Sequence, residues 1–224
     1  MVQGTEGAAP LSHRERKKAR TRAALIEVSQ RLFAEQGYGS TTLEDICDEV
    51  DIRPQTLLRY FESKAALALA PMTDPLERLR AFLEDPDRRH DTIKVWREYV
   101  RRESTEMTSP TSDTIVSYVH NLRDFRSWVD RDPVLVAMTS DVERRLRQLL
   151  ARSLARDRGV DADDLHSTLV AALLVAGRTA VYERWLARDP DTETLVDDQL
   201  AVVDYVVTSL PRQSARRLLK VASG

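Results

Sequence analysis

Apolar residues recur at intervals of three and four along most of the chain, which is the spacing of an amphipathic helix. The first such segment runs from His13 to Gln36 and stops before Gly37, a residue that commonly ends helices. The same spacing predicts further helices over residues 41–50, 54–61, 63–70, 76–83, 93–107, 115–129, 133–156, 163–187 and 192–210. The sequence lacks the two-residue alternation of a half-buried strand, so the pattern predicts an all-α fold.

Between Thr41 and Lys64 the predicted helices are short and closely spaced. Thr41, with Glu44 three residues later, matches a capping box, in which each side chain bonds the other residue's backbone amide. One apolar stripe follows at i, i+3, i+4 and i+7, formed by Leu43, Ile46, Cys47 and Val50. Residues 51–53 interrupt the stripe, and Pro54 suits the first position of the next helix. The stretch therefore predicts a helix, a turn and a second helix.

The second short helix has one apolar and one polar side. Leu57 and Phe61 lie four residues apart and are expected to pack on the preceding helix. The side chains left facing outward are Gln55, Thr56, Arg59 and Tyr60. Because such residues contact base edges and phosphates, the segment predicts a DNA-binding helix-turn-helix.

A third helix is expected to begin after Ser63 as its cap, which places Lys64 in the first turn. A cation is unfavourable at that end of a helix dipole, and a bound phosphate would relieve the repulsion. Farther along, Pro71 and Pro75 lack the amide that a helix needs, so we expect a break or kink near Pro71.

A long helix ending in LFAEQGY, followed by TTLEDI, QTLLRYF and SK, resembles the TetR family of transcriptional regulators over roughly the first third of the chain. The resemblance implies that the second helix of the motif enters the major groove of DNA. It also implies a carboxy-terminal helical domain that binds a small ligand and forms the dimer. Asp51 stands at the family's usual turn glycine, Arg53 at its cap serine and Leu58 at its first tyrosine, a phosphate contact. Asp51 can still adopt a left-handed conformation.

The predicted DNA contacts follow from the motif and from this resemblance. Gln55 and Thr56 are expected to reach base edges. The expected phosphate contacts are Thr42, Arg53, Tyr60 and Lys64, helped by Arg14, Lys17 and Lys18. Pro54 and Arg59 complete the predicted DNA-binding surface.

Charge changes this picture only locally. The 34 basic and 36 acidic residues nearly cancel, so a global positive field does not draw this chain to nucleic acid. Between Ser12 and Arg22, however, there are six basic residues and only one acidic residue, Glu15. Such a run alone is usually a solvated helical turn, but beside the motif we expect it to lie on backbone phosphates.

Composition indicates a cytoplasmic protein without a membrane partner. The lone Cys47 excludes an intramolecular disulfide, fits a reducing compartment, and lies on an apolar stripe where a small core residue is expected. The sequence has no secretory signal and no unbroken apolar run of roughly eighteen residues. Residues 1–12 are rich in Gly, Ala and Pro and are predicted to be a disordered tail.

The last two predicted helices are apolar on two faces. In residues 163–187 one stripe consists of Leu165, Leu169, Ala172, Leu173, Ala176 and Ala180, and the other of Val170, Leu174, Val181 and Trp185. Residues 192–210 show the same doubling. One face would serve the core and the other a second subunit, which predicts a homodimer through a four-helix interface, as the family resemblance also implies. The expected domains are 13–70 for DNA, 71–210 for effector and dimer, and a basic tail over 211–224.

Aromatic residues concentrate in the predicted effector domain. Core packing is the ordinary explanation for each of them, because an apolar stripe at helical spacing normally means burial. A ligand pocket is the alternative, since pockets between helices are mainly apolar with a few polar groups. The candidate ligand-binding residues are Trp96, Tyr99, Tyr118, Phe125, Trp128, Arg178 and Tyr182. Their hydroxyls and the guanidinium would orient a polar or acidic head group.

Enzymatic chemistry finds little support in the sequence. Only Asp163 with His166 has the spacing of a di-iron ligand pair, and the partner glutamates are missing. Because phosphate-loop and nucleophile-elbow motifs are also absent, we predict no metal, no cofactor and no catalytic residue.

The predicted function is a ligand-responsive transcriptional regulator that represses from palindromic operator DNA as a homodimer. An apolar or amphipathic small molecule would release it. Two other classes stay open at this point. An architectural DNA-binding protein without effector would show a steep salt dependence and negligible specificity. A helical enzyme that retains the motif would convert its bound ligand.

Overall fold

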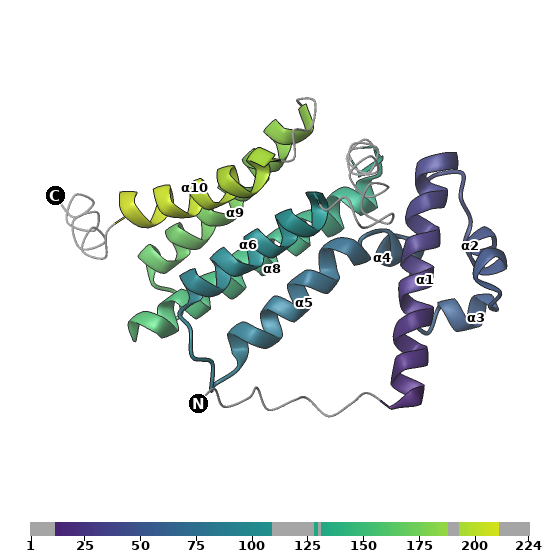
Figure 1. The fold of residues 1–224 in the computed structure, drawn as a ribbon, viewed down its shortest axis with the longest axis horizontal. Coiled ribbons are helices and arrows are strands. Elements are labelled where there is room, and N and C mark those ends of the chain that lie inside the picture. Colours follow the sequence, from purple (N-terminus) through teal and green to yellow (C-terminus); the bar gives the residue numbers. More distant parts are fainter. Residues whose placement is uncertain (1–11, 109–127, 130, 188–192, 211–224) are drawn as a thin grey trace. The chain divides into compact units, whose positions relative to one another are not determined.

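The computed structural model describes residues 12–108, 128–129, 131–187 and 193–210. Every regular element in these ranges is a helix, which confirms the predicted all-α fold (Figure 1). The chain divides into two compact units, Met1–Ala70 and Pro71–Gly224. Two predicted segments, most of helix 115–129 and the tail 211–224, lie outside the described residues.

Within its described residues, 12–70, the first unit contains four complete helices, with α1 packed on α2 and α4, and α2 packed on α3. Their bounds are α1 His13–Gln36, α2 Leu43–Val50, α3 Pro54–Leu57 and α4 Lys64–Ala68. The largest buried apolar side chains are Leu25, Leu32, Phe33, Ile46, Leu57, Phe61, Leu67 and Leu69. These residues fall at helical spacing along each segment, so the apolar pattern predicts the core of this unit.

The two ends of α1 are capped as its sequence requires. The Ser12 hydroxyl accepts from the Glu15 amide, and the Glu15 carboxylate accepts from the Ser12 amide at 2.8 Å. Gly37 follows the last turn at φ 87°, where its amide donates to the Phe33 carbonyl. Ser12 is therefore a helix cap rather than part of the predicted tail, and the remainder of that tail lies outside the described residues.

The second unit is a helical bundle in which α8 packs on α9 and α6, and α10 packs on α9 and α6 (Figure 1). The bounds of its helices are α5 Ala70–Glu84, α6 Thr92–Thr108, α8 Pro133–Arg158, α9 Leu165–Ala187 and α10 Glu193–Ser209. The larger apolar cluster of this unit, which includes Trp96, Leu150 and Leu174, joins all five helices. Asp132 caps α8 with Pro133 in its first turn, and Gly159 ends it, as predicted.

The predicted break near Pro71 lies two residues earlier. Helix α4 ends at Ala68 with Leu69 as its cap, and α5 begins at Ala70. Pro71 therefore occupies the first turn of α5, where a missing amide breaks no helical hydrogen bond. Pro75 is accommodated inside α5. Pro71 starts a helix rather than interrupting one.

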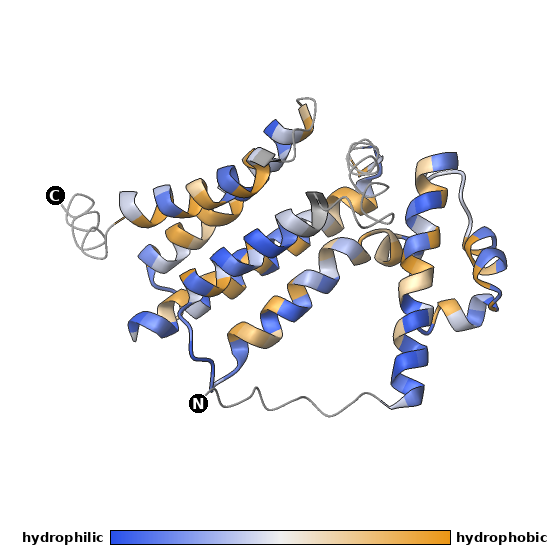
Figure 2. Ribbon diagram, viewed as in Figure 1, coloured by the Kyte–Doolittle hydropathy of each residue, from blue (hydrophilic) through white to orange (hydrophobic). Residues whose placement is uncertain are grey.

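Helix α9 has the two apolar faces that its sequence predicts. Val170, Leu174 and Trp185 are buried, whereas the large side chains Leu165, Leu169 and Leu173 are exposed at 44%, 36% and 45%. Figure 2 shows apolar residues along much of α9, in contrast to the hydrophilic first turns of α1. By length and hydropathy alone α9 could cross a membrane, although it packs here on α8 and α10. The stripe of exposed leucines therefore remains uncovered in the single chain.

Candidate functional site

The polar side of α3 faces solvent, and the buried side chains Leu57 and Phe61 hold the opposite side of this segment in the core. Leu57 and Phe61 are buried as predicted, while Gln55 and Arg59 are exposed and Thr56 is half-buried. The helix itself is one turn long, and beyond it Arg59 and Tyr60 donate their amides to carbonyls three residues back. The second helix of the motif is thus shorter than predicted, but its backbone continues in tight turns to Phe61.

The turn between α2 and α3 has the backbone that the sequence predicts. Asp51 caps α2 at φ 53° and ψ 52°, in the left-handed region. Aspartate tolerates this conformation because its short side chain can hydrogen-bond locally. Arg53 then occupies the cap position of α3 without making a side-chain cap bond, so its exposed guanidinium lies at the start of the polar surface.

The capping box of α2 is displaced by one residue from its predicted place. Thr42 and Asp45 form it, with the Thr42 amide 2.7 Å from the Asp45 carboxylate and the Asp45 amide 3.1 Å from the Thr42 hydroxyl. Hydrogen bonds from the Thr42 amide and side chain to the Asp45 carboxylate lower the pKa of Asp45. Thr41 is instead buried and donates its hydroxyl to the Leu32 and Gly37 carbonyls. The predicted partnership of Thr41 with Glu44 is wrong, and Thr42 is the residue exposed at the helix start.

Lys64 connects the start of α4 with the start of α2. Its ammonium donates to the Thr41 carbonyl at 2.8 Å and lies 4.3 Å from the centre of the Tyr38 ring. Ser63 caps α4 by accepting from the Ala66 amide, as predicted. Lys64 is therefore positioned, half-exposed, beside Thr42 rather than extended freely into solvent.

The basic run of α1 remains accessible. Arg14, Lys17, Lys18 and Arg20 are exposed on its first turns, whereas Arg22 lies 4.7 Å from the centre of the buried Phe61 ring. Phe61 belongs to the segment that carries the polar side of α3, so this contact links the basic part of α1 to that surface. All eleven residues predicted to contact DNA lie in the first unit.

The predicted ligand residues are only partly brought together. Trp96 is fully buried in the core of the second unit and stacks on Tyr99 with ring centres 5.2 Å apart. Trp128 is half-buried next to the start of α8, while Tyr118 and Phe125 lie outside the described residues. Arg178 lies 4.8 Å from the Tyr182 ring centre, so these two residues form a second group.

Glu103 of α6 joins these groups, and the sequence pattern did not identify it. Arg178 donates to both of its carboxylate oxygens at 2.7 Å, and the hydroxyls of Tyr99 and Tyr182 each donate at 3.3 Å. Burial opposes the charge of Arg178, but the adjacent carboxylate raises its pKa above the ordinary value. Burial and the same carboxylate raise the pKa of Tyr182, which keeps its hydroxyl a donor. The guanidinium expected to bind an acidic head group is thus already neutralised.

The start of α9 holds a charge cluster rather than a metal site. The Asp164 carboxylate accepts from the Ser167 amide and hydroxyl and pairs with Arg158. His166 is buried, and this burial lowers its pKa and favours the neutral ring. In the described ranges no three metal-binding side chains gather into a potential site.

Comparisons with known proteins cover both units. Residues 25–70 match the family described as bacterial regulatory proteins, tetR family, and residues 127–210 match the MftR C-terminal domain. The chain is 31% identical over 184 residues to the transcriptional regulator TcmR of Streptomyces glaucescens, covering 81% of this chain and 80% of TcmR. It is 25% identical over 197 residues to the regulator MftR of Mycobacterium tuberculosis, covering 88% of this chain and 94% of MftR.

The fold is also similar to that of solved structures. A complex of SmeT with triclosan has a TM-score of 0.60 at 19% identity, covering 88% of this chain and 94% of that chain. SmeT is described as the repressor of the Stenotrophomonas maltophilia multidrug efflux pump SmeDEF. The fold, the helix-turn-helix and the identity to TcmR along most of both chains lead to one conclusion. The chain belongs to the TetR family of bacterial regulatory proteins and is a ligand-responsive transcriptional regulator, not an enzyme.

Proposed function

We propose that the protein is a repressor that binds palindromic operator DNA as a homodimer and is released by a small apolar or amphipathic molecule. The observation that carries the DNA-binding part is the exposed polar side of α3, anchored from beneath by Leu57 and Phe61. Gln55 and Thr56 contact base edges in this proposal, because an amide and a hydroxyl can both donate to and accept from bases.

Phosphate contacts surround these two residues. Thr42, Arg53, Tyr60 and Lys64 supply hydroxyl and cationic groups near the motif, with Pro54 and Arg59 between them. Lys17, Lys18 and Arg14 add exposed charge from α1. Such contacts fix the orientation of the protein on the duplex, while the base contacts supply sequence preference.

The dimer uses α9 and α10. The exposed stripe of Leu165, Leu169 and Leu173 recurs every four residues on α9, and α10 exposes Tyr205 and Val207 at 72% and 43%. Large side chains of this kind, on two helices that already pack together, favour a second copy of the same pair as their partner. Two-fold symmetry would then present two α3 surfaces to the two halves of a palindrome.

Effector binding belongs to the second unit, where the half-buried Glu103 group and the aromatic rings lie. The similarity in fold to SmeT, solved with triclosan, supports a small-molecule effector for this chain as well. A cytoplasmic location fits the buried Cys47 thiol, whose pKa is raised by burial and which therefore stays protonated and unreactive.

Selection from a pool of random duplexes tests the DNA-binding proposal without knowledge of the operator. The full chain should enrich a palindrome whose half-sites are centred about one helical turn or a small multiple apart, roughly 34 Å per turn. The enriched duplex should bind at least about 1,000-fold more tightly than random DNA at physiological salt. Equal affinity for both duplexes, with a steep salt dependence, would instead identify an architectural DNA-binding protein.

A further inference from the structure

A groove between α5 and α6 has an apolar floor and a cationic rim. Its volume is about 680 Å³, and Leu79, Phe82 and Val95 contribute to the floor. Phe82 is 46% exposed, which is unusual for a phenylalanine with buried neighbours on both helices. Cationic side chains along the rim outnumber the acidic ones, Glu98 and Glu103. The groove therefore combines exposed apolar surface with excess positive charge.

Several of the rim charges are already paired. Arg97 pairs with Asp204 of α10, Arg101 pairs with Glu98, and Glu103 pairs with Arg178. Arg78 of α5 and Lys94 of α6 differ, because neither side chain has a carboxylate partner within the described part of the chain. The two helices thus each direct one uncompensated cation toward the same groove.

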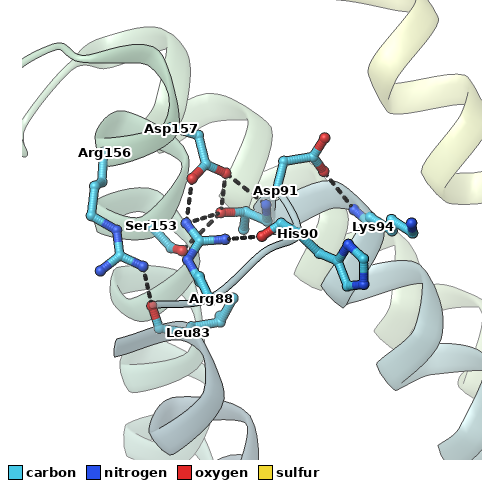
Figure 3. Close-up of polar contacts among 9 residues, drawn as sticks. Leu83, Arg88, His90, Asp91, Lys94, Ser153, Arg156 and Asp157 are labelled. Carbon is cyan, nitrogen blue, oxygen red and sulfur yellow. Dashed lines mark hydrogen bonds and ion pairs between the residues drawn. The ribbon is translucent and has the colours of Figure 1, made fainter. Parts of the chain in front are cut away.

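The helix end that carries Lys94 is fixed by a clamp of polar contacts to α8. Arg88, whose side chain is only 5% exposed, pairs with Asp157 of α8, and Asp157 also accepts from the Thr92 amide and hydroxyl at 2.6 Å. The Lys94 amide donates to Asp91 at 2.8 Å. Figure 3 shows this clamp, with the side chains of His90 and Lys94 directed away from it.

A second contact fixes α5, the other helix of the groove, near its end. Arg156 of α8 donates to the Leu83 carbonyl near the end of α5 (Figure 3). Both groove-forming helices are thereby tied to α8, so the end of the groove that carries Lys94 is positioned before any ligand arrives. Preorganised charges bind an anion better than charges that must first be ordered.

We propose that this groove binds an amphipathic organic anion, with its carboxylate or phosphate head at Arg78 and Lys94 and its apolar tail over Leu79, Phe82 and Val95. The proposal rests on the proposed effector function and names the chemical class of the effector. Lys94 and Glu103 are separated by nine residues of α6, so the groove extends roughly 13 Å along the helix. An extended aliphatic chain fits that length.

Calorimetric titration of the full chain without DNA, using decanoate and 1-decanol, separates the head-group contribution from that of the tail. Decanoate should bind roughly tenfold or more tightly than decanol, because its carboxylate gains charge-assisted hydrogen bonds. Arg78→Gln and Lys94→Gln should each reduce this ratio, and the double substitution should abolish it. Phe82→Ala should weaken both probes alike and leave the ratio unchanged.

Arg80→Gln is the matched control, since Arg80 is an exposed α5 arginine that pairs with Glu77 and does not line the groove. It should keep the full preference for decanoate. Equal binding of the two probes, no binding of decanoate, or an unchanged ratio in the double variant would each overturn the assignment.

The same variants distinguish this assignment from the regulatory proposal. If decanoate binds through Arg78 and Lys94 but leaves the protein on its selected duplex, the groove is a binding site and release by its ligand is refuted. If another small molecule releases the DNA equally well in wild type and in the double variant, the regulatory function stands and the groove is not its effector site.

Discussion

Two adjacent threonines at the start of α2 have different partners. Thr41 is 1% exposed and bonds two carbonyls at the end of α1, whereas Thr42 caps α2 together with Asp45. One residue therefore holds the two helices together, and its neighbour leaves a hydroxyl at the surface near Lys64. A shift of one position would exchange these roles, so the start of α2 is sensitive to single substitutions.

The capping assignment predicts a contrast between two neighbouring acids. Asp45→Ala removes the bond to the Thr42 amide and should lower the midpoint of urea unfolding, while Glu44→Ala should leave the midpoint unchanged. Because the cap lowers the pKa of Asp45 below its ordinary 3.8, its stabilisation is present above that pH and is lost as the pH falls through the folded pKa. The difference between Asp45→Ala and wild type should accordingly shrink in acid. A larger loss for Glu44→Ala would restore the rejected capping box.

Alanine substitutions at Gln55 and Lys64 are expected to weaken DNA binding in different ways. Gln55→Ala should cost about 1–3 kcal/mol on the selected duplex and remove discrimination at one position in each half-site, because a base contact is lost. Lys64→Ala should weaken selected and random duplexes alike and reduce the salt slope by about one for each lost phosphate contact. Anisotropy titrations at several salt concentrations measure both effects.

A stability control is needed because Lys64 also bonds the Thr41 carbonyl. The melting temperature of Lys64→Ala should be measured alongside, and Arg31→Ala serves as a comparison that breaks an α1 ion pair away from the predicted DNA surface. If Gln55→Ala lost affinity equally on both duplexes, Gln55 would only position the protein.

At the scale of whole elements, the packing of α9 on α10 is set by a glycine. A Cβ atom added at Gly177 would lie 2.4 Å from a methyl of Val202, far inside a normal contact. The next residue, Arg178, offers its carbonyl to the buried amide of Gln199 at 3.2 Å. The close approach of these helices therefore also determines where the Arg178 side chain meets Glu103 on α6.

The close approach predicts coupling between Gly177 and Val202. Gly177→Ala should destabilise the second unit through a clash of about 1–3 kcal/mol, partly offset by the better helix propensity of alanine. Adding Val202→Ala makes room for the new methyl, so the double variant should lose less stability than the sum of the two single variants. Chemical unfolding of all four proteins measures this coupling, and strictly additive losses would show that the helices can simply move apart.

The helices themselves were predictable from the sequence because burial follows the helical period. The Thr42 cap was not, since Thr41–Glu44 and Thr42–Asp45 fit the same four-residue pattern and only the burial of Thr41 distinguishes them. Glu103 was missed for a related reason. Its partner Arg178 lies 75 residues away, and local spacing carries no information on such pairs. Most of the candidate DNA-binding residues, from Thr42 to Lys64, occupy one continuous motif, so local spacing was enough to group them.

At the scale of the molecule, the exposed stripe on α9 predicts how two chains associate. Leu169→Asp puts a charge into the proposed interface and should raise the dimer dissociation constant at least about 100-fold, equivalent to roughly 3 kcal/mol. Since Leu169 is already 36% exposed in the single chain, the monomer should remain folded. Val136→Asp, at a similarly exposed position on α8, should leave association unchanged. Sedimentation velocity with circular dichroism measures both properties.

Dimeric, sequence-specific DNA binding is tested most directly by the stoichiometry and affinity of the full chain on its selected palindrome. The comparison is the same duplex with one scrambled half-site. Native mass spectrometry and anisotropy should show two chains on the palindrome, and scrambling one half-site should cost about half of the binding free energy above random DNA, because the linked pair then keeps one of its two specific half-site contacts. Leu169→Asp, which disrupts the pair, should remove most of the affinity difference between the two duplexes. A single chain bound to the palindrome, with equal affinity for the scrambled duplex, would contradict the account.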